Sequence, residues 1–143
     1  MKNDIINRYL VFLIFIPFIG ILFSFHFIPL FLAGSIFYIF KENLKYQRYY
    51  ILILTIFIFN IIEVTQGFKL FSLTLVSIFL YILILPYIKK VISSSVITEI
   101  ANIFLFYLFL FIILIYMKDP DKFLYVVLMI NLFIDSILVG FVL

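Results

Sequence analysis

The chain has 143 residues, of which 68% are hydrophobic and only 12% are charged, and its formal net charge is +3. About a quarter of the residues in a soluble domain are charged, so this composition excludes a water-soluble fold and predicts an all-α integral membrane protein. The chain has no cysteine and one histidine. These counts exclude a disulfide framework, a Cys/His zinc site and a cysteine nucleophile.

Six apolar runs separated by short polar intervals are candidate membrane spans: roughly 9–23, 25–40, 49–62, 70–88, 96–117 and 123–143. A helix that crosses about 30 Å of hydrocarbon needs about 20 residues. The last three runs meet this length. The first three must recruit flanking residues, tilt, or lie in locally thinner bilayer. We therefore expect one polytopic domain, a six-transmembrane-helix bundle.

Residues 9–40 are compatible with one long helix or with a tight helical hairpin. One helix over this segment would be about 48 Å long, which exceeds the hydrocarbon thickness of about 30 Å. Pro17, Gly20 and Pro29 also weaken its continuity. We expect a hairpin that turns near residues 24–26.

Basic residues predict the orientation of the six spans. The side that holds both termini carries seven of them and the other side carries three: Lys2, Arg8, Lys41, Lys45, Arg48, Lys89 and Lys90 against Lys69, Lys118 and Lys122. Cytoplasmic loops of membrane proteins are enriched in Lys and Arg. This bias predicts that both termini are cytoplasmic.

A polar corner, "EVTQGFK" over residues 63–69, separates the third and fourth spans. Glu63 can be a solvated turn carboxylate with Gly67 as an ordinary helix C-cap. Alternatively, the corner is re-entrant and packs against helices or a partner, because lipid cannot satisfy its backbone groups.

Asp135 lies about 12 residues into the last span, near the middle of the bilayer. A charged Asp at that depth costs roughly 2.5–3.5 kcal/mol on insertion scales. Asn131 lies one turn earlier on the same face. The pair can serve a proton or ion relay, bind a ligand, or form polar contacts between helices. Since no second carboxylate lies at mid-membrane depth, the structural alternative is favoured.

Glu99 and Asn102 lie one turn apart near the cytoplasmic start of the fifth span. A carboxylate there is favourable beside the positive end of the helix dipole. The sequence contains no nucleophile–base pair, P-loop or metalloprotease motif. We therefore expect no enzymatic activity, no cofactor and no metal site.

The segment "FNIIEVTQGFKLF" resembles the signature of the rod shape-determining protein MreD family. In that pattern an acidic residue ends one helix, a glycine turn follows, and a leucine opens the next helix. Glu63, Gly67 and Leu70 match these positions, whereas the glycine after the leucine is replaced by Phe71. Residues 26–90 follow the family pattern of helices and basic loops.

The resemblance implies a non-enzymatic scaffold of the cell-elongation machinery in the bacterial inner membrane. It implies an MreC-like bitopic partner, with MreB, RodA and its penicillin-binding transpeptidase as further members of the assembly. An alternative is a small transporter subunit resembling the substrate-binding S components of vitamin importers, with Asp135, Asn131 and Asn102 lining its pocket.

Overall fold

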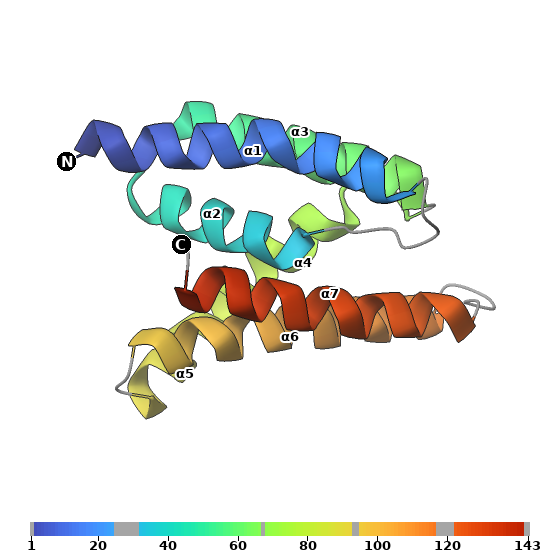
Figure 1. Ribbon diagram of the computed structural model, residues 1–143. Coiled ribbons are helices and arrows are strands. Elements are labelled where there is room, and N and C mark those ends of the chain that lie inside the picture. The colour runs from blue at the N-terminus through green and yellow to red at the C-terminus, as the bar shows by residue number, and fades with distance from the viewer. Residues whose placement is uncertain (1, 25–31, 67, 93–94, 117–121, 142–143) are drawn as a thin grey trace.

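The computed structural model describes residues 2–24, 32–66, 68–92, 95–116 and 122–141, and within them every regular element is helical (Figure 1). The elements are α1 (Lys2–Ser24), α2 (Ala33–Lys45), α3 (Tyr49–Gln66), α4 (Ser72–Phe79), the π-helical η1 (Leu80–Ile84), α5 (Leu85–Val91), α6 (Ser95–Tyr116) and α7 (Lys122–Phe141). The prediction of an all-α chain is confirmed.

Four helices are long and apolar enough to cross a membrane, over Tyr49–Gln66, Ser72–Val91, Ser95–Tyr116 and Phe123–Phe141. They correspond to the last four predicted spans, with ends shifted by a few residues. A chain with four such helices is a multi-pass membrane protein.

The first two predicted spans differ from the helices observed. Within the described residues, the apolar part of α1 covers Ile6–Gly20. The span predicted over 25–40 is instead a 13-residue helix, α2, which begins at Ala33 and ends at Lys45. Such a helix is about 20 Å long, too short to cross the hydrocarbon alone. The single long helix is excluded because α1 ends at Ser24 and Leu32 adopts a left-handed conformation, with φ 46°. Residues 25–31, with the predicted turn at His26, lie outside the described part.

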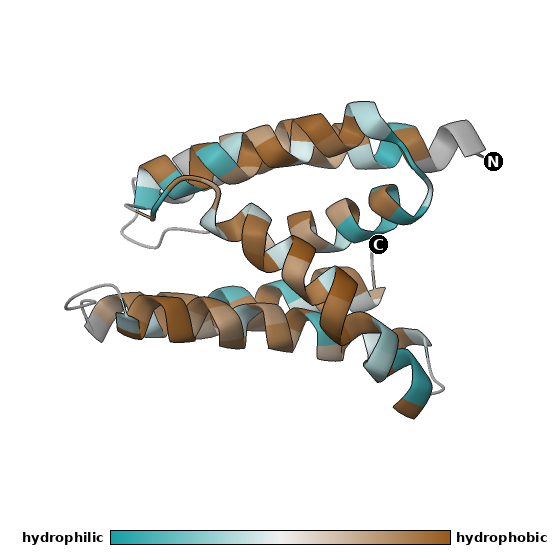
Figure 2. Cartoon of the chain, turned by 180° about the vertical axis from the view of Figure 1, so that it is seen from behind, coloured by the Kyte–Doolittle hydropathy of each residue, from teal (hydrophilic) through white to brown (hydrophobic). Residues whose placement is uncertain are grey.

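Polar and apolar side chains are distributed as expected for a molecule surrounded by lipid. The interior holds a set of fully buried polar residues, among them Ser35, Glu63, Ser77, Asn131 and Asp135. The outward faces expose large apolar side chains of every long helix, and hydrophobic colouring dominates those helices in Figure 2. Hydrocarbon is a favourable surrounding for such faces, whereas water is not.

Helix α2 occupies the centre of the bundle and packs against α3, α6 and α7. Most of its residues are buried. The Phe37 ring stacks on Phe106 of α6 with 4.8 Å between centroids, and Phe59 of α3 contacts Phe106 at 6.4 Å. Offset aromatic pairs add about 0.5–1.5 kcal/mol beyond area burial, so this cluster fixes α2 between its neighbours.

The helix over Ser72–Val91 is interrupted by one π-helical turn. Pro86 lies just after η1, near the start of α5. Proline lacks a backbone N–H and clashes with the carbonyl four residues earlier. The wider turn over Leu80–Ile84 accommodates that defect without ending the helix.

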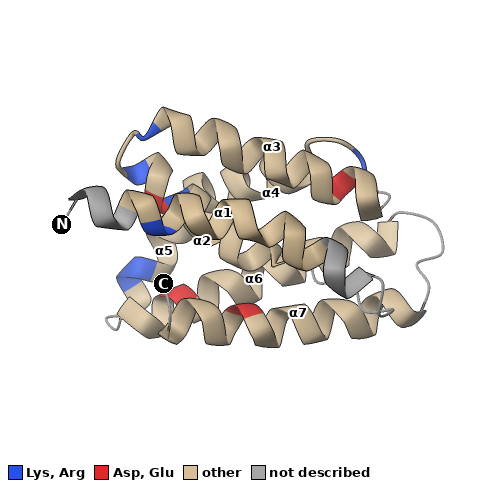
Figure 3. Cartoon of the chain, turned by 45° about the horizontal axis from the view of Figure 1, so that its top comes forward, with Lys and Arg blue, Asp and Glu red and all other residues tan. Residues whose placement is uncertain are grey.

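Basic residues gather at one end of the bundle, where α1 begins and α7 ends (Figure 3). Lys69 lies in the turn between α3 and α4, at the other end of α3 from Arg48. We call the first end, which carries Arg8, Lys41, Lys45, Arg48, Lys89 and Lys90, the basic end.

Candidate functional site

Asp135 of α7 is fully buried and accepts hydrogen bonds from two other helices. The backbone N–H of Gly34 donates to its Oδ2 at 2.9 Å, and the Ser35 hydroxyl donates to its Oδ1 at 2.5 Å. The Tyr107 hydroxyl of α6 also donates to Oδ2. One side chain therefore joins α2, α6 and α7 in the middle of the bundle.

This contact supplies the cap that α2 lacks. The residue before the helix, Leu32, has no side chain that can accept a hydrogen bond. The first N–H groups of a helix have no partner within the helix, and each carries partial positive charge. Asp135 accepts from the Gly34 N–H and the Ser35 side chain, so a residue about 100 positions away replaces the local N-cap.

The close approach of α2 to Asp135 requires glycine at position 34. A Cβ atom there would lie 2.8 Å from Oδ2 of Asp135, 2.9 Å from Cε2 of Tyr107 and 3.0 Å from Cγ2 of Ile103. Gly140 of α7 is less crowded, since the nearest neighbour of a Cβ atom there would be Cδ1 of Ile100 at 3.9 Å.

Asn131, on the same face of α7, is fully buried, and its side-chain amide donates to the Val127 carbonyl at 2.8 Å. The Ser136 hydroxyl donates to the Leu132 carbonyl at 2.8 Å. The hydrogen bonds described from the start of α2 to α7 go to Asp135.

Glu63 has the corresponding role at the other end of the molecule. It is fully buried in the last turn of α3. Its Oε2 accepts from the Phe71 N–H at 2.5 Å, and its Oε1 accepts from the Leu73 N–H at 2.6 Å. The Ser72 hydroxyl lies 3.3 Å from Oε1. Glu63 thus caps α4, which starts after a left-handed Phe71 (φ 65°) and, like α2, has no cap of its own.

The corner between α3 and α4 is therefore held from inside. The Phe68 N–H also bonds to the Glu63 carbonyl at 2.9 Å, as in the six-residue closure of a Schellman motif. The interpretation of Glu63 as a solvated turn carboxylate is wrong, because both of its oxygens are buried against backbone donors. Gly67, the predicted turn glycine, lies outside the described residues.

Two apolar side chains project from this corner. Leu70 is 59% exposed and Phe71 is 52% exposed, whereas Phe68 is buried. Of the two described residues that match the MreD pattern, Leu70 is thus exposed and Glu63 internal. We call Lys69, Leu70 and Phe71 the exposed corner.

At the basic end, the buried Lys41 and the partly exposed Glu99 form an ion pair between α2 and α6. Lys41 is 2% exposed. The second span was expected to end at residue 40, but α2 continues to Lys45, so Lys41 lies within a helix and not in the loop after it. The Asn102 amide makes a long contact of 3.5 Å with Glu99.

The arrangement is suited to holding helices together. Among the described residues, no group of three His, Cys, Asp or Glu side chains could hold a metal ion. Three described surface grooves are lined almost wholly by apolar side chains of the long helices. One of them, about 230 Å³ between α6 and α7, includes Tyr107 in its wall.

Sequence reasoning missed three residues of the Asp135 cluster, namely Gly34, Ser35 and Tyr107. The small residues Ala33–Gly34–Ser35 after an apolar run were a usable signal for close helix contact. Tyr107 carries no comparable signal, because it lies among many aromatic residues.

Asp135, Asn131 and Asn102 were expected to line one pocket in the transporter alternative. The hydrogen bonds described for these three side chains go to different partners.

A comparison of this chain with models of protein families, with curated proteins and with solved structures finds no significant match.

Proposed function

We propose that this protein is a non-enzymatic scaffold of the bacterial inner membrane, and that it binds another membrane protein through the exposed corner. One observation carries the proposal. The fully buried Glu63 holds Phe71 in a left-handed conformation and, with it, the apolar pair Leu70–Phe71 outside the bundle. A bulky residue with positive φ is uncommon. Such strain persists where the surrounding structure imposes it, and it clusters at functional positions.

The proposed partner follows from the resemblance to the MreD family. An MreC-like bitopic protein has one membrane helix and an extracytoplasmic domain, and it would meet the corner where its helix leaves the bilayer. Through that partner the scaffold would join MreB, RodA and its penicillin-binding transpeptidase in the elongation machinery. Preformed apolar side chains on a rigid corner lower the ordering cost of binding.

The proposal includes six membrane-crossing segments with both termini in the cytoplasm. The concentration of basic side chains at one end of the bundle supports this orientation. In this topology α1 is the first segment and α2 is the cytoplasmic part of the second. The start of α2 lies inside the protein on Asp135, where lipid does not have to satisfy its backbone.

The test is co-purification from a bacterial host with the variant Leu70→Ala. Truncation of one of the few residues that dominate an interface costs more than about 1 kcal/mol. If Leu70 is such a residue, recovery of the MreC-like partner should fall about tenfold. Leu75→Ala is the matched control, because Leu75 is 65% exposed on α4 but outside the corner. Equal recovery with both variants would contradict the proposal.

A second candidate, the substrate-binding subunit of a transporter, is favoured by the start of α2 inside the bundle. Interrupted helices whose ends lie within the membrane are typical of transporters. The same co-purification distinguishes the two candidates. An ATPase module recovered in place of elongation proteins would favour the transporter subunit.

A further inference from the structure

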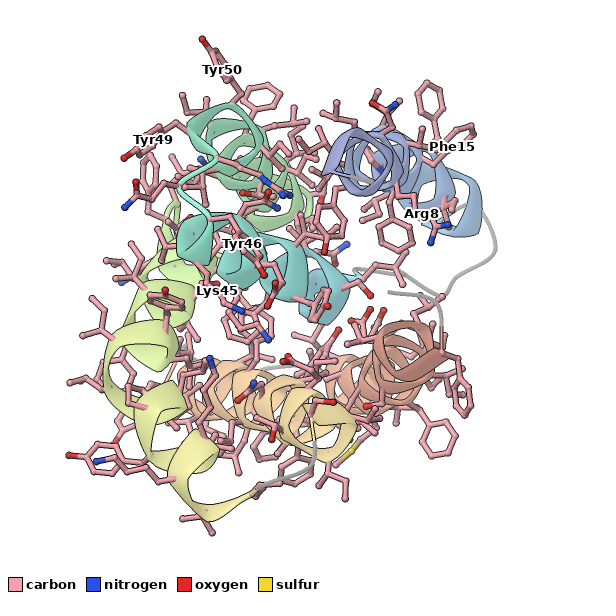
Figure 4. All side chains as sticks on the ribbon, turned by 90° about the vertical axis from the view of Figure 1, so that its left-hand side faces the viewer. Arg8, Phe15, Lys45, Tyr46, Tyr49 and Tyr50 are labelled. Carbon is pink, nitrogen blue, oxygen red and sulfur yellow. The ribbon has the colours of Figure 1, made fainter. Side chains whose placement is uncertain are left out.

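The turn between α2 and α3 carries a cluster of cationic and aromatic side chains at the basic end, all of them exposed except the half-buried Arg48. Lys45 ends α2 and Arg48 precedes α3, with Tyr46 between them. Tyr46, Tyr49 and Tyr50 are 53%, 66% and 92% exposed. Figure 4 views the molecule from this end and labels Lys45, Tyr46, Tyr49 and Tyr50 at the turn. We call Lys45, Tyr46, Arg48, Tyr49 and Tyr50 the turn patch.

The backbone of the patch has a defined geometry. The Arg48 N–H bonds to the Asn43 carbonyl at 3.0 Å, and the Gln47 N–H bonds to the Leu44 carbonyl at 3.3 Å. These are the two bonds of a Schellman motif. Gln47 takes the left-handed position, with φ 55°, where glycine is usual. The next helix begins at once, since the Leu52 N–H bonds to the Arg48 carbonyl.

Two positive charges converge on one aromatic ring in this turn. The Lys45 Nζ lies 4.9 Å from the centroid of Tyr46, and the Arg48 Cζ lies 5.1 Å from the same centroid. Each cation is attracted by the ring, but the two cations repel each other. The Glu42 carboxylate and the Tyr46 side chain raise the pKa of Lys45, so Lys45 is charged at neutral pH.

The neighbouring carboxylates do not neutralise this end of the molecule. The described side chains there include six cations, Arg8, Lys41, Lys45, Arg48, Lys89 and Lys90, but only two carboxylates, Glu42 and Glu99. Glu99 is paired with Lys41, and Glu42 also lies 4.0 Å from Lys41. An excess of positive charge therefore faces outward around the patch.

The patch lies at the depth of the lipid headgroups. Helix α3 has 18 residues, so it is about 27 Å long, close to the thickness of the hydrocarbon. Its first residue, Tyr49, therefore lies at the boundary of the hydrocarbon, and Lys45 and Arg48 lie just beyond it. Exposed tyrosines at this boundary match the aromatic belt of membrane proteins.

We propose that the turn patch is a binding site for the headgroup of an anionic phospholipid, with the phosphate between Lys45 and Arg48 and the tyrosines beside the upper acyl chains. An anion there relieves the repulsion between the two cations and forms charge-assisted hydrogen bonds with both. Because the site is fixed by a hydrogen-bonded turn, little ordering is needed on binding. The inference is independent of the scaffold proposed above.

The chain has no tryptophan, which allows a site-specific test. Tyr46→Trp places one fluorophore in the patch and keeps an aromatic ring for the cations. Leu70→Trp places it at the opposite end, at a position of similar exposure. Each full-length variant is reconstituted in bilayers that mix phosphatidylcholine with brominated phosphatidylglycerol, and in the reverse mixture. Quenching then reports which lipid lies beside each tryptophan.

We expect phosphatidylglycerol to be preferred at position 46 by about 5- to 30-fold, since one or two cations near the surface contribute about 1 kcal/mol each. The preference should weaken as salt is raised and should be absent at position 70. In the Tyr46→Trp background, Lys45→Ala should reduce it, and Lys45→Ala with Arg48→Ala should abolish it. Lys69→Ala is the control and should leave it unchanged.

Three results would overturn the inference. The first is equal quenching by both lipids at position 46. The second is a preference that survives in the Lys45→Ala, Arg48→Ala variant, provided that its thermal midpoint shows it to be folded. The third is loss of the preference on adding millimolar inorganic phosphate at constant ionic strength, which would identify a site for free phosphate instead of a lipid.

Discussion

At the scale of single residues, two buried carboxyl groups organise the molecule. Asp135 and Glu63 are fully buried. Each accepts a hydrogen bond from a backbone N–H in the first turn of a helix that lacks its own N-cap. A buried donor or acceptor without a hydrogen-bond partner destabilises a protein by about 1–3 kcal/mol. Here the carboxylate oxygens and the N–H groups at the helix start provide partners for each other. We interpret both residues as structural on this ground.

Gly34 provides a residue-scale prediction. Gly34→Ala would force a Cβ within 3.0 Å of Asp135 and Tyr107 and should destabilise the protein by about 1–3 kcal/mol, as overpacking does. The thermal midpoint in detergent measures this effect. Gly140→Ala is the control and should leave the midpoint nearly unchanged, because its nearest neighbour would be 3.9 Å away. Similar midpoints for the two variants would contradict the close packing of α2 on α7.

At the scale of elements, the start of α4 depends on a residue of α3. Both Glu63 oxygens face backbone N–H donors, at Phe71 and Leu73. The positive end of a helix dipole adds an attraction for the carboxylate. Local propensity does not explain why the helix begins there, since a left-handed phenylalanine is an unfavourable N-cap.

Glu63→Gln tests this dependence. An amide offers one acceptor oxygen and one donor NH₂ group, so at least one backbone N–H should lose its partner, at a cost of about 1–3 kcal/mol. Hydrogen exchange at Phe71 and Leu73 should accelerate by about 5- to 100-fold if opening of this turn limits exchange. Glu42→Gln is the control. Unchanged exchange in the Glu63 variant would show that the carboxylate does not hold the start of α4.

At the scale of the whole molecule, apolar faces point outward and polar groups lie inside, while basic residues gather at one end. The lack of native cysteine makes the topology directly measurable. We expect single cysteines at Lys45 and Lys90 to react with a membrane-impermeant maleimide from the cytoplasmic side, and one at Lys69 to react from the outside. Labelling of Lys45→Cys and Lys69→Cys from the same side would refute the proposed orientation.

Much of the architecture could be predicted from hydrophobic runs and their polar boundaries. The four long helices begin and end within a few residues of the predicted spans. A run of about 20 apolar residues is most stable in a bilayer as a helix that crosses it. The second helix could not be located in this way. Its boundaries depend on a left-handed Leu32 and on an acceptor about 100 residues away, and neither is visible in a local window of sequence.

The sequence by itself determined that the chain is an all-α membrane protein and that Asp135 and Glu63 are unusual, because charge within apolar runs is costly. Only the tertiary structure decided what these residues contact. It turned Glu63 inward and left Leu70 exposed, paired Lys41 with Glu99, and brought Gly34, Ser35 and Tyr107 to Asp135. The reason is physical: composition predicts that a buried polar group needs a partner, whereas the packing of distant helices selects which partner it finds.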